Sequence, residues 1–192
     1  MKVLFVSPEV GPIVRAGGLG DVVGALPLAL HEIGVDVRVI CPLHRECKEL
    51  PAQTLPTKFK LKYGSRTYES KIKETRLGES SIPVYLLEND ILFDRPGIYA
   101  DENGDYQDNP IRCFALCQSA LLIEKITGWS PDIFHAHDWM AASLPAYLNF
   151  KNSRLKKINQ ARSVLTIHNL EHQGSFHKET FKLSGLPSLY SG

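Results

Sequence analysis

Long apolar runs and cysteine are both scarce in this 192-residue sequence. No run approaches the ~20 apolar residues that a membrane-spanning helix needs. The apolar segment after Met1-Lys2 is too short for a signal-peptide core and fits a buried strand. The four cysteines form no Cys-x-x-Cys pair. We therefore expect no membrane partner, and reduced thiols in a cytoplasmic protein, with Cys113 and Cys117 on one helix face.

An excess of charge of either sign is also lacking. The 22 Lys and Arg residues nearly balance 21 Asp and Glu residues, which leaves a net charge of +1. This excludes the strongly basic surface that favours nucleic acid or an anionic membrane. The apolar fraction of 43% and the charged fraction of 22% are typical of a soluble globular protein. A chain of this length forms one domain, or at most two small ones, with a sizeable core.

What is present is an alternation of apolar strands with amphipathic helices. The continuous apolar run at Lys2–Ser7 favours a central parallel strand. Expected strands follow at Val35–Cys41, Lys58–Tyr63, Thr67–Glu74, Ile82–Leu87, Asp132–Ala136 and Ser163–Ile167, and expected helices at Gly20–Ile33, Asp108–Ile126 and Trp139–Asn149. Gly64-Ser65-Arg66 predicts a hairpin, His44–Pro56 an irregular connection, and Asp94–Gln107 a long loop. The order predicts an α/β protein with a twisted, mainly parallel sheet, helices on both faces and a hairpin insertion.

The segment Arg15-Ala16-Gly17-Gly18-Leu19-Gly20-Asp21 joins the first strand to the first helix. Glycines let the backbone approach a ligand closely, and a helix N-terminus offers unpaired N–H groups to an anion. Arg15 adds a cation. The segment predicts a site for a phosphorylated ligand, although a glycine pair is also compatible with a plain turn.

Two further polar segments follow strands, where the function of parallel sheets concentrates. They are His135-Ala136-His137-Asp138-Trp139 and Thr166-Ile167-His168-Asn169-Leu170. Alternation places His135 and His137 on one side of a strand, as in a metal site. No carboxylate or cysteine is positioned to complete such a site, so we expect no metal and a core role for His135, hydrogen-bonded to backbone. His168-Asn169 is also compatible with a cap on a turn.

A nicotinamide-dependent dehydrogenase is an alternative function, based on the glycines at 18, 20 and 24. That fingerprint requires its first glycine directly after the first strand, and here residues 8–16 intervene. It also requires an acidic residue at the end of the second strand, where Val39-Ile40-Cys41-Pro42 has none. The pattern therefore argues against this alternative.

Five motifs in order give the chain a specific resemblance. They are the opening KVLFVSPE, then RAGGLGDV with GALP, DRPGIY with Asp108, Asn109 and Arg112, HAHDW, and TIHN with Gln173-Gly174. In these motifs the whole chain resembles the amino-terminal half of bacterial glycogen synthases and plant starch synthases, retaining glucosyltransferases of family five. The resemblance implies two Rossmann-like halves in the GT-B arrangement, with residues 1–192 as the amino-terminal domain and the nucleotide-binding carboxy-terminal domain absent.

The resemblance also implies a reaction, the transfer of glucose from ADP-glucose to the non-reducing end of an α-1,4-glucan without a cofactor. It assigns His168 and Asp138 to catalysis. It places Arg15, Gly17 and Gly18 at the donor phosphates. Tyr99, Trp139 and Asn169 are expected to bind substrate, with the aromatic rings along the acceptor path. Asp21 is expected either to contact the acceptor or only to stabilise the helix N-terminus.

Two departures from the family pattern leave alternatives open. Arg15 stands where the family has lysine, and a planar guanidinium does not reproduce a compact ammonium, so ADP and UDP donors both stay possible. The family's second half supplies most nucleotide contacts, so we expect a carboxy-terminal domain or a second chain to complete the cleft. A non-catalytic glucan-binding half-domain, or half of a split enzyme, is the alternative. A plant origin would imply a plastid location, although the sequence shows no transit peptide.

Overall fold

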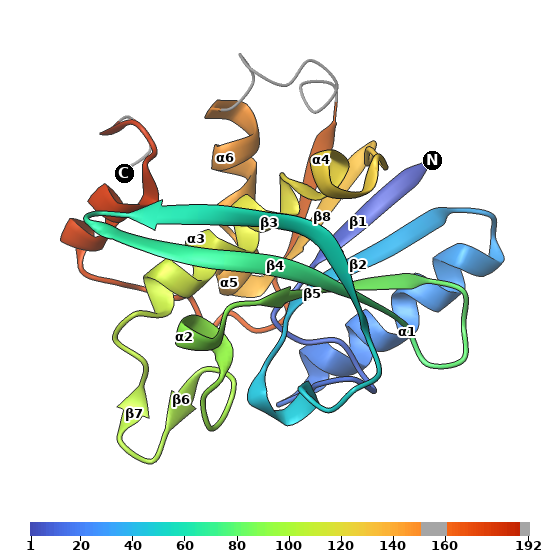
Figure 1. Cartoon of the computed structure of the whole chain (residues 1–192), viewed down its shortest axis with the longest axis horizontal. Coiled ribbons are helices and arrows are strands. Elements are labelled where there is room, and N and C mark those ends of the chain that lie inside the picture. The colour runs from blue at the N-terminus through green and yellow to red at the C-terminus, as the bar shows by residue number, and fades with distance from the viewer. Residues whose placement is uncertain (151–160, 189–192) are drawn as a thin grey trace.

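A computed structural model describes residues 1–150 and 161–188, with a seven-stranded sheet at the centre (Figure 1). The strand order is β3-β4-β5-β2-β1-β8-β9. Five strands run parallel, namely β1 (Lys2–Val6), β2 (Asp36–Pro42), β5 (Pro83–Glu88), β8 (Ile133–His137) and β9 (Arg162–Thr166). The hairpin strands β3 (Gln53–Tyr63) and β4 (Arg66–Arg76) are antiparallel. The predicted mainly parallel α/β fold is confirmed.

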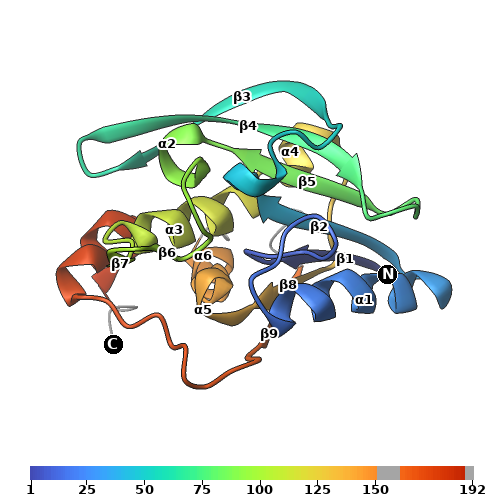
Figure 2. The same ribbon diagram turned by 90° about the horizontal axis from the view of Figure 1, so that it is seen from below.

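The two faces of the sheet hold separate cores because side chains alternate along each strand. Val3 and Phe5 of β1 join the cluster beneath α1 (Gly18–Glu32), and Leu4 and Val6 join the cluster on the opposite face. That second cluster includes the buried side of α3 (Asn109–Ala120), α5 (Asp138–Ala141) and α6 (Leu144–Phe150). Figure 2 shows α1 apart from the α3, α5 and α6 group. Helices therefore cover both faces, as predicted.

Two predicted helices are each divided in the structure. The predicted helix Trp139–Asn149 forms α5 and α6, because Pro145 lies in the first turn of α6 and has no N–H to continue α5. The predicted helix Asp108–Ile126 forms α3 and α4 (Ile123–Thr127), a division that nothing in the structure explains. Asp108 precedes α3 without a side-chain cap bond, since its carboxylate accepts both hydrogen bonds from Arg95 at 2.6 Å.

The hairpin is longer than predicted and its turn is tighter. Arg66 pairs with Tyr63, so the turn has two residues, led by Gly64 at a φ of 59°. Residues 53–56, expected in an irregular connection, belong to β3. This edge strand accommodates Pro56 where its register shifts between Thr54 and Lys58. The inner side of the hairpin packs on α3 through Tyr63 and Phe114, whose ring centroids are 6.3 Å apart.

The segment expected as a long loop contains short regular elements. It follows α2 (Asp90–Phe93) and includes the two-residue strands β6 (Ala100–Asp101) and β7 (Gly104–Asp105). The 3-10 helix η4 (Lys178–Ser184) follows β9, and η1 (Arg45–Cys47) precedes the hairpin. All four cysteines are free and buried. Among the described residues, no helix is long and apolar enough to cross a membrane.

Candidate functional site

A cleft of about 980 Å³ opens at the carboxyl ends of β1, β8 and β9. It gathers the glycine loop, the end of β8 and the segment after β9, which lie far apart in the sequence. Seven of the nine predicted site residues line it: Gly17, Gly18, Tyr99, Asp138, Trp139, His168 and Asn169. Arg15 and Asp21 do not line the cleft. The parallel topology thus brings the three polar segments together, because the carboxyl ends of parallel strands lie at one edge of the sheet.

The glycine loop presents part of its backbone to this cleft. A Cβ built on Gly17 or Gly18 would meet no atom within 4 Å, so a ligand can reach the backbone there. The helix starts at Gly18, two residues earlier than predicted, and its first amides have no acceptor within the helix. Arg15, however, pairs with Asp21, and both side chains are exposed. The Arg15 guanidinium, which was predicted to contribute to the anion site, therefore binds a carboxylate of α1 outside the cleft.

The carboxylate of Glu9 accepts hydrogen bonds from the backbone amides just before the helix. One carboxylate oxygen accepts hydrogen bonds from Ala16 N at 2.6 Å and Gly17 N at 3.0 Å, and the other accepts from the Tyr99 hydroxyl. Glu9 is only 2% exposed. Burial and this carboxylate together raise the pKa of Tyr99. Sequence reasoning missed Glu9 as a site residue, although it lies in the opening motif directly after the first strand.

Asp138 and His168 form a connected pair at the ends of β8 and β9. Among the described residues, Asp138 is the only non-glycine with a positive φ, at 54°. Such strained backbone is frequent at functional sites. Its Oδ1 accepts a hydrogen bond from His168 N at 2.7 Å, which ties the two strand ends together. Asn169 accepts from Glu171 N at 2.9 Å, so it stabilises a turn as well as lining the cleft.

His135 and His137 lie beside this pair and form a group of three histidines with His168. His137 Nδ1 lies 3.0 Å from His168 Nε2, and the rings of His135 and His137 have centroids 4.1 Å apart. Burial, followed by the charges of His135 and His168, lowers the pKa of His137 to about 3. His135 was expected to bond backbone, and it instead contacts the Thr166 hydroxyl at 2.7 Å, because parallel pairing brings β9 beside it. Within the described part of the chain, no group of three or more acidic, His or Cys side chains could hold a metal ion.

Aromatic rings form one wall of the cleft. The ring centroid of Trp139 lies 5.6 Å from that of Tyr99 and 5.8 Å from that of Phe176. Gly174, at a φ of 60°, allows this packing, since an added Cβ would lie 2.8 Å from the Trp139 Cβ. Phe176 was not predicted as a site residue, and only its position after Gln173-Gly174 hinted at it. The wall offers flat apolar faces of the kind on which sugar rings stack.

Comparison with known proteins settles the family. Residues 2–191 match the model of the starch synthase catalytic domain. The chain belongs to this family. It is 39% identical over its whole length to glycogen synthase 2 of Geobacter metallireducens, of which it covers 40%. It is 37% identical to the glycogen synthase of Rhodospirillum rubrum over 97% of its length, and covers 38% of that protein.

Among solved structures, this family member is similar to the catalytic domain of starch synthase IV from Arabidopsis thaliana bound to ADP and acarbose. The TM-score is 0.82 and the sequence identity 28%, over 96% of this chain and 37% of the plant chain. The Rossmann-like architecture of the domain is therefore shown. The chain spans about 40% of the length of the curated relatives it matches.

Proposed function

We propose that the chain is the amino-terminal half of an active site that transfers glucose from ADP-glucose to the non-reducing end of an α-1,4-glucan with retention. The single observation that supports this most strongly is the cleft itself. Open helix N-terminal amides, an aromatic wall, and the residues Asp138 and His168 all line it. A nucleotide sugar and a glucan need these three surfaces in one place.

In the proposed reaction, the bond from the anomeric carbon to the diphosphate breaks and a bond to the acceptor 4-hydroxyl oxygen forms. The hydroxyl proton passes to the leaving diphosphate. Charge develops on the sugar and on the diphosphate, and fixed dipoles that face these positions stabilise the transition state. The Gly18 amide faces the diphosphate, since Glu9 already occupies the Ala16 and Gly17 amides. His168 contacts the transferred glucose through its backbone carbonyl and its ring, and the adjacent Asp138 holds it.

The acceptor side is assigned to the aromatic wall. Tyr99 is held by Glu9 and packs against Trp139, so the two rings keep a fixed orientation toward a bound glucan. Preorganised rings lower the entropy lost on binding. Asn169 lines the same side. Arg15 and Asp21, which pair with each other outside the cleft, are assigned at most a contact at its rim.

A carboxy-terminal domain or second chain is proposed to complete the cleft. The region around β9 exposes large apolar side chains, including Val164 at 45%, Ile167 at 56% and Leu170 at 71%. β9 also forms an open edge of the sheet. A cluster of exposed apolar residues beside a site usually marks a surface that another element covers. On this basis the 192-residue chain alone folds but does not elongate a glucan. The completed enzyme is proposed to work in the cytoplasm.

Glucan binding without transfer is a second candidate, favoured by the aromatic wall being complete within this chain. Calorimetric titration of the 192-residue chain with maltotetraose and with ADP tests the assignment of the cleft. We expect weak glucan binding, on the order of millimolar, and weaker ADP binding, since an open half-site buries little ligand surface. Tight ADP binding with no glucan response would contradict the assignment.

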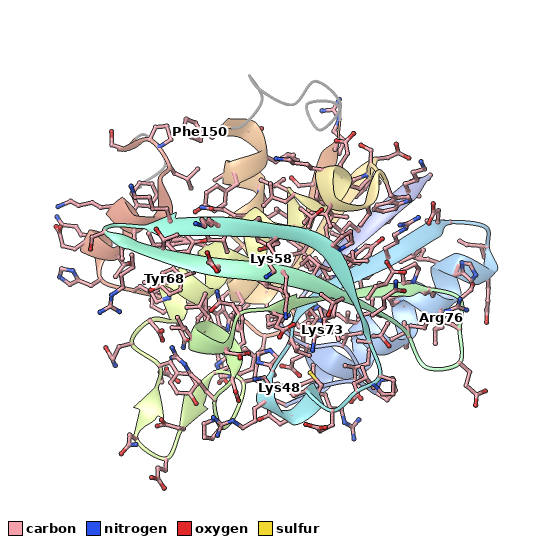
Figure 3. All side chains as sticks on the ribbon, viewed as in Figure 1. Lys48, Lys58, Tyr68, Lys73, Arg76 and Phe150 are labelled. Atoms are coloured by element: carbon pink, nitrogen blue, oxygen red, sulfur yellow. The ribbon has the colours of Figure 1, made fainter. Side chains whose placement is uncertain are left out.

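A matched pair of phenylalanines provides the control for this titration. Phe176 is 42% exposed in the cleft, and Phe150 is 45% exposed at the end of α6, where it does not line the cleft (Figure 3). Phe176→Ala should weaken maltotetraose binding severalfold, and Phe150→Ala should leave it unchanged. Equal effects of the two variants on maltotetraose binding would contradict the assignment of the glucan to the aromatic wall.

Turnover distinguishes the two candidates. The chain should transfer glucose from ADP-glucose only when the carboxy-terminal half of a relative is added or fused. In that completed enzyme, His168→Ala should lower kcat by roughly 10²-fold or more, as expected for a positioned transition-state group. Failure of every completed enzyme to elongate maltotetraose, with glucan binding retained, would support the non-catalytic candidate.

A further inference from the structure

The ring of His137, at the end of β8, is held by its neighbours. The residue is fully buried. Its ring stacks on Phe5, with centroids 5.1 Å apart and planes 17° apart. The His168 ring lies end to end with it and nearly coplanar, with centroids 5.3 Å apart and planes 19° apart. The rings of Phe5 and His135, with centroids 5.1 Å and 4.1 Å away, prevent the His137 ring from turning without repacking its surroundings. The direction of its two nitrogens is therefore set by the fold.

The two nitrogens of His137 have different surroundings. Nδ1 lies 3.0 Å from Nε2 of His168. Nε2 is buried and has no hydrogen-bond partner among the described residues. A hydrogen bond between two ring nitrogens needs one proton between them, so one ring donates and the other accepts. The partner that donates decides the tautomer of both rings.

The unpartnered nitrogen favours one of the two arrangements. If His168 donates, neutral His137 must carry its own proton on Nε2, as a buried N–H without an acceptor. If His137 donates from Nδ1, its Nε2 is only a lone pair, and orphaned buried N–H groups are rarer than under-used acceptors. A doubly protonated His137 is excluded near neutral pH, since burial and the neighbouring His135 and His168 lower its pKa to about 3.

We propose that His137 is a positioning residue that donates from Nδ1 to His168 Nε2 and thereby holds His168 in the tautomer protonated at Nδ1. Asp138 completes the arrangement by accepting from the His168 backbone amide. Consecutive residues at the end of β8 thus fix both the backbone and the ring of His168.

This arrangement defines what His168 offers to a ligand. Its Nε2 is engaged by His137, so its Nδ1–H is the ring's remaining polar group. A neutral ring in this state donates to a hydroxyl or phosphate oxygen and has no free lone pair to remove a proton. His168 therefore acts as a hydrogen-bond donor and not as a general base. The identity of the ligand oxygen rests on the proposed function, whereas the tautomer does not.

Nitrogen NMR of the 192-residue chain labelled with 15N-histidine tests the proposal without any turnover. Near pH 7.5, His168 should show a protonated-type shift at Nδ1 and a bare-type shift at Nε2, and His137 should show the same pattern. Protonation of His168 at Nε2, or averaged shifts at both of its nitrogens, would overturn the proposal.

Two variants at position 137 separate positioning from packing. His137→Leu removes the donor, so His168 should change to averaged shifts. His137→Asn offers an amide N–H near the place of Nδ1, so it should restore the single tautomer. The exposed His177 gives the control, since His177→Ala should leave the His168 shifts unchanged. If His137→Leu does not fold, the wild-type spectrum and the asparagine variant still decide the question.

Adding maltotetraose or ADP to the labelled chain distinguishes this inference from the proposed function. The expected result is a change of the His168 Nδ1 shift that saturates with one of these ligands. A correct tautomer with no response to either ligand would remove His168 from the proposed substrate site and leave the positioning by His137 in place. A response together with the opposite tautomer would overturn the positioning and retain the site.

Discussion

The β3–β4 hairpin and the cleft at the ends of β8 and β9 are built on opposite principles. In the hairpin, exposed lysines alternate with Phe59, Leu61 and Tyr63, which face the core. Figure 3 shows Lys58 and Lys73 on these strands, and Lys73 also pairs with Glu88. The lysines of β3, which is an edge strand, protect the sheet from unwanted strand pairing. The hairpin's alternating pattern is that of a stable edge of a sheet, with the Tyr63 hydroxyl as the one buried polar side-chain atom of β3 and β4 that has no hydrogen-bond partner among the described residues.

The cleft departs from this pattern in several places. Asp138 has a left-handed backbone, His137 has an unpartnered buried nitrogen, and β9 exposes Val164 and Leu165. Each of these features costs folding free energy locally. The comparison teaches that stability comes from the hairpin, β5 and the two cores, while the cleft uses part of that stability to hold strained and polar groups in place.

Large-to-small substitutions should give the largest difference between the two regions. Leu86 on β5 is fully buried, so Leu86→Ala should destabilise the fold by about 2–5 kcal/mol. Leu165 on β9 is 40% exposed, and Leu165→Ala should cost about 1 kcal/mol or less. Urea denaturation of the 192-residue chain measures both. Equal losses would show that β9 is as tightly packed as the centre of the sheet.

Acid should destabilise the protein through buried neutral histidines. His44 Nε2 lies 2.9 Å from the Pro8 carbonyl oxygen, and burial, followed by the charge of Arg112, lowers its pKa from 6.5 to about 4. The unfolded chain takes up this proton at higher pH than the folded chain. The contribution of His44 to the free energy of unfolding should therefore fall by about 3 kcal/mol as the pH drops from 6.5 to 4.

Denaturation curves across this pH range check the prediction, and His44→Gln provides the control. Glutamine keeps a donor for Pro8 but does not titrate, so the variant should lose the part of the pH dependence that comes from His44. The part from His137 in the cleft should persist, because its pKa is lowered to about 3. Parallel curves for the variant and the wild type would exclude His44 as the cause.

Two glycines with left-handed backbone, of which only Gly174 lines the cleft, distinguish the cost of backbone strain from the cost of a lost side-chain contact. Gly174, at a φ of 60°, lies against Trp139, and Gly185, at a φ of 71°, has no atom within 4 Å of a built Cβ. Alanine at either position should cost about 1–2 kcal/mol from backbone strain. Only Gly174→Ala should also displace Trp139, seen as a changed tryptophan fluorescence spectrum and weaker maltotetraose binding. Identical spectra for the two variants would contradict the packing.

The smallest effect is expected for the exposed ion pair beside the glycine loop. Arg15 and Asp21 have side chains that are 63% and 61% exposed. Arg15→Lys keeps the charge and Arg15→Gln removes it, and both should change the free energy of unfolding by less than about 0.5 kcal/mol. Thermal denaturation at low and high salt measures this. A loss above about 1 kcal/mol would make the pair a structural element of the loop.

The sequence alone determined the alternation of strands and helices, the mainly parallel sheet and the meeting of the glycine and histidine segments at one edge. These predictions succeed because apolar periodicity and the glycine and histidine motifs are local, and parallel strands necessarily end at one edge. The family resemblance named seven residues that line the cleft, and their roles stay a prediction. The sequence also indicated the hairpin, since Gly64-Ser65 separates two alternating segments. It could not give the hairpin's length, because Pro56 is a residue that usually ends a strand. Only the edge position of β3 in the folded sheet allows a proline within it.

Tertiary structure alone decided which groups touch which. Arg15 turns to Asp21, Glu9 takes the Ala16 and Gly17 amides, and Asp108 binds Arg95 in place of capping α3. The contact between His137 and His168 likewise exists only because β9 ends near β8 across 31 positions in the chain. Such choices depend on competition between partners brought together by the fold, and a linear pattern carries no record of that competition.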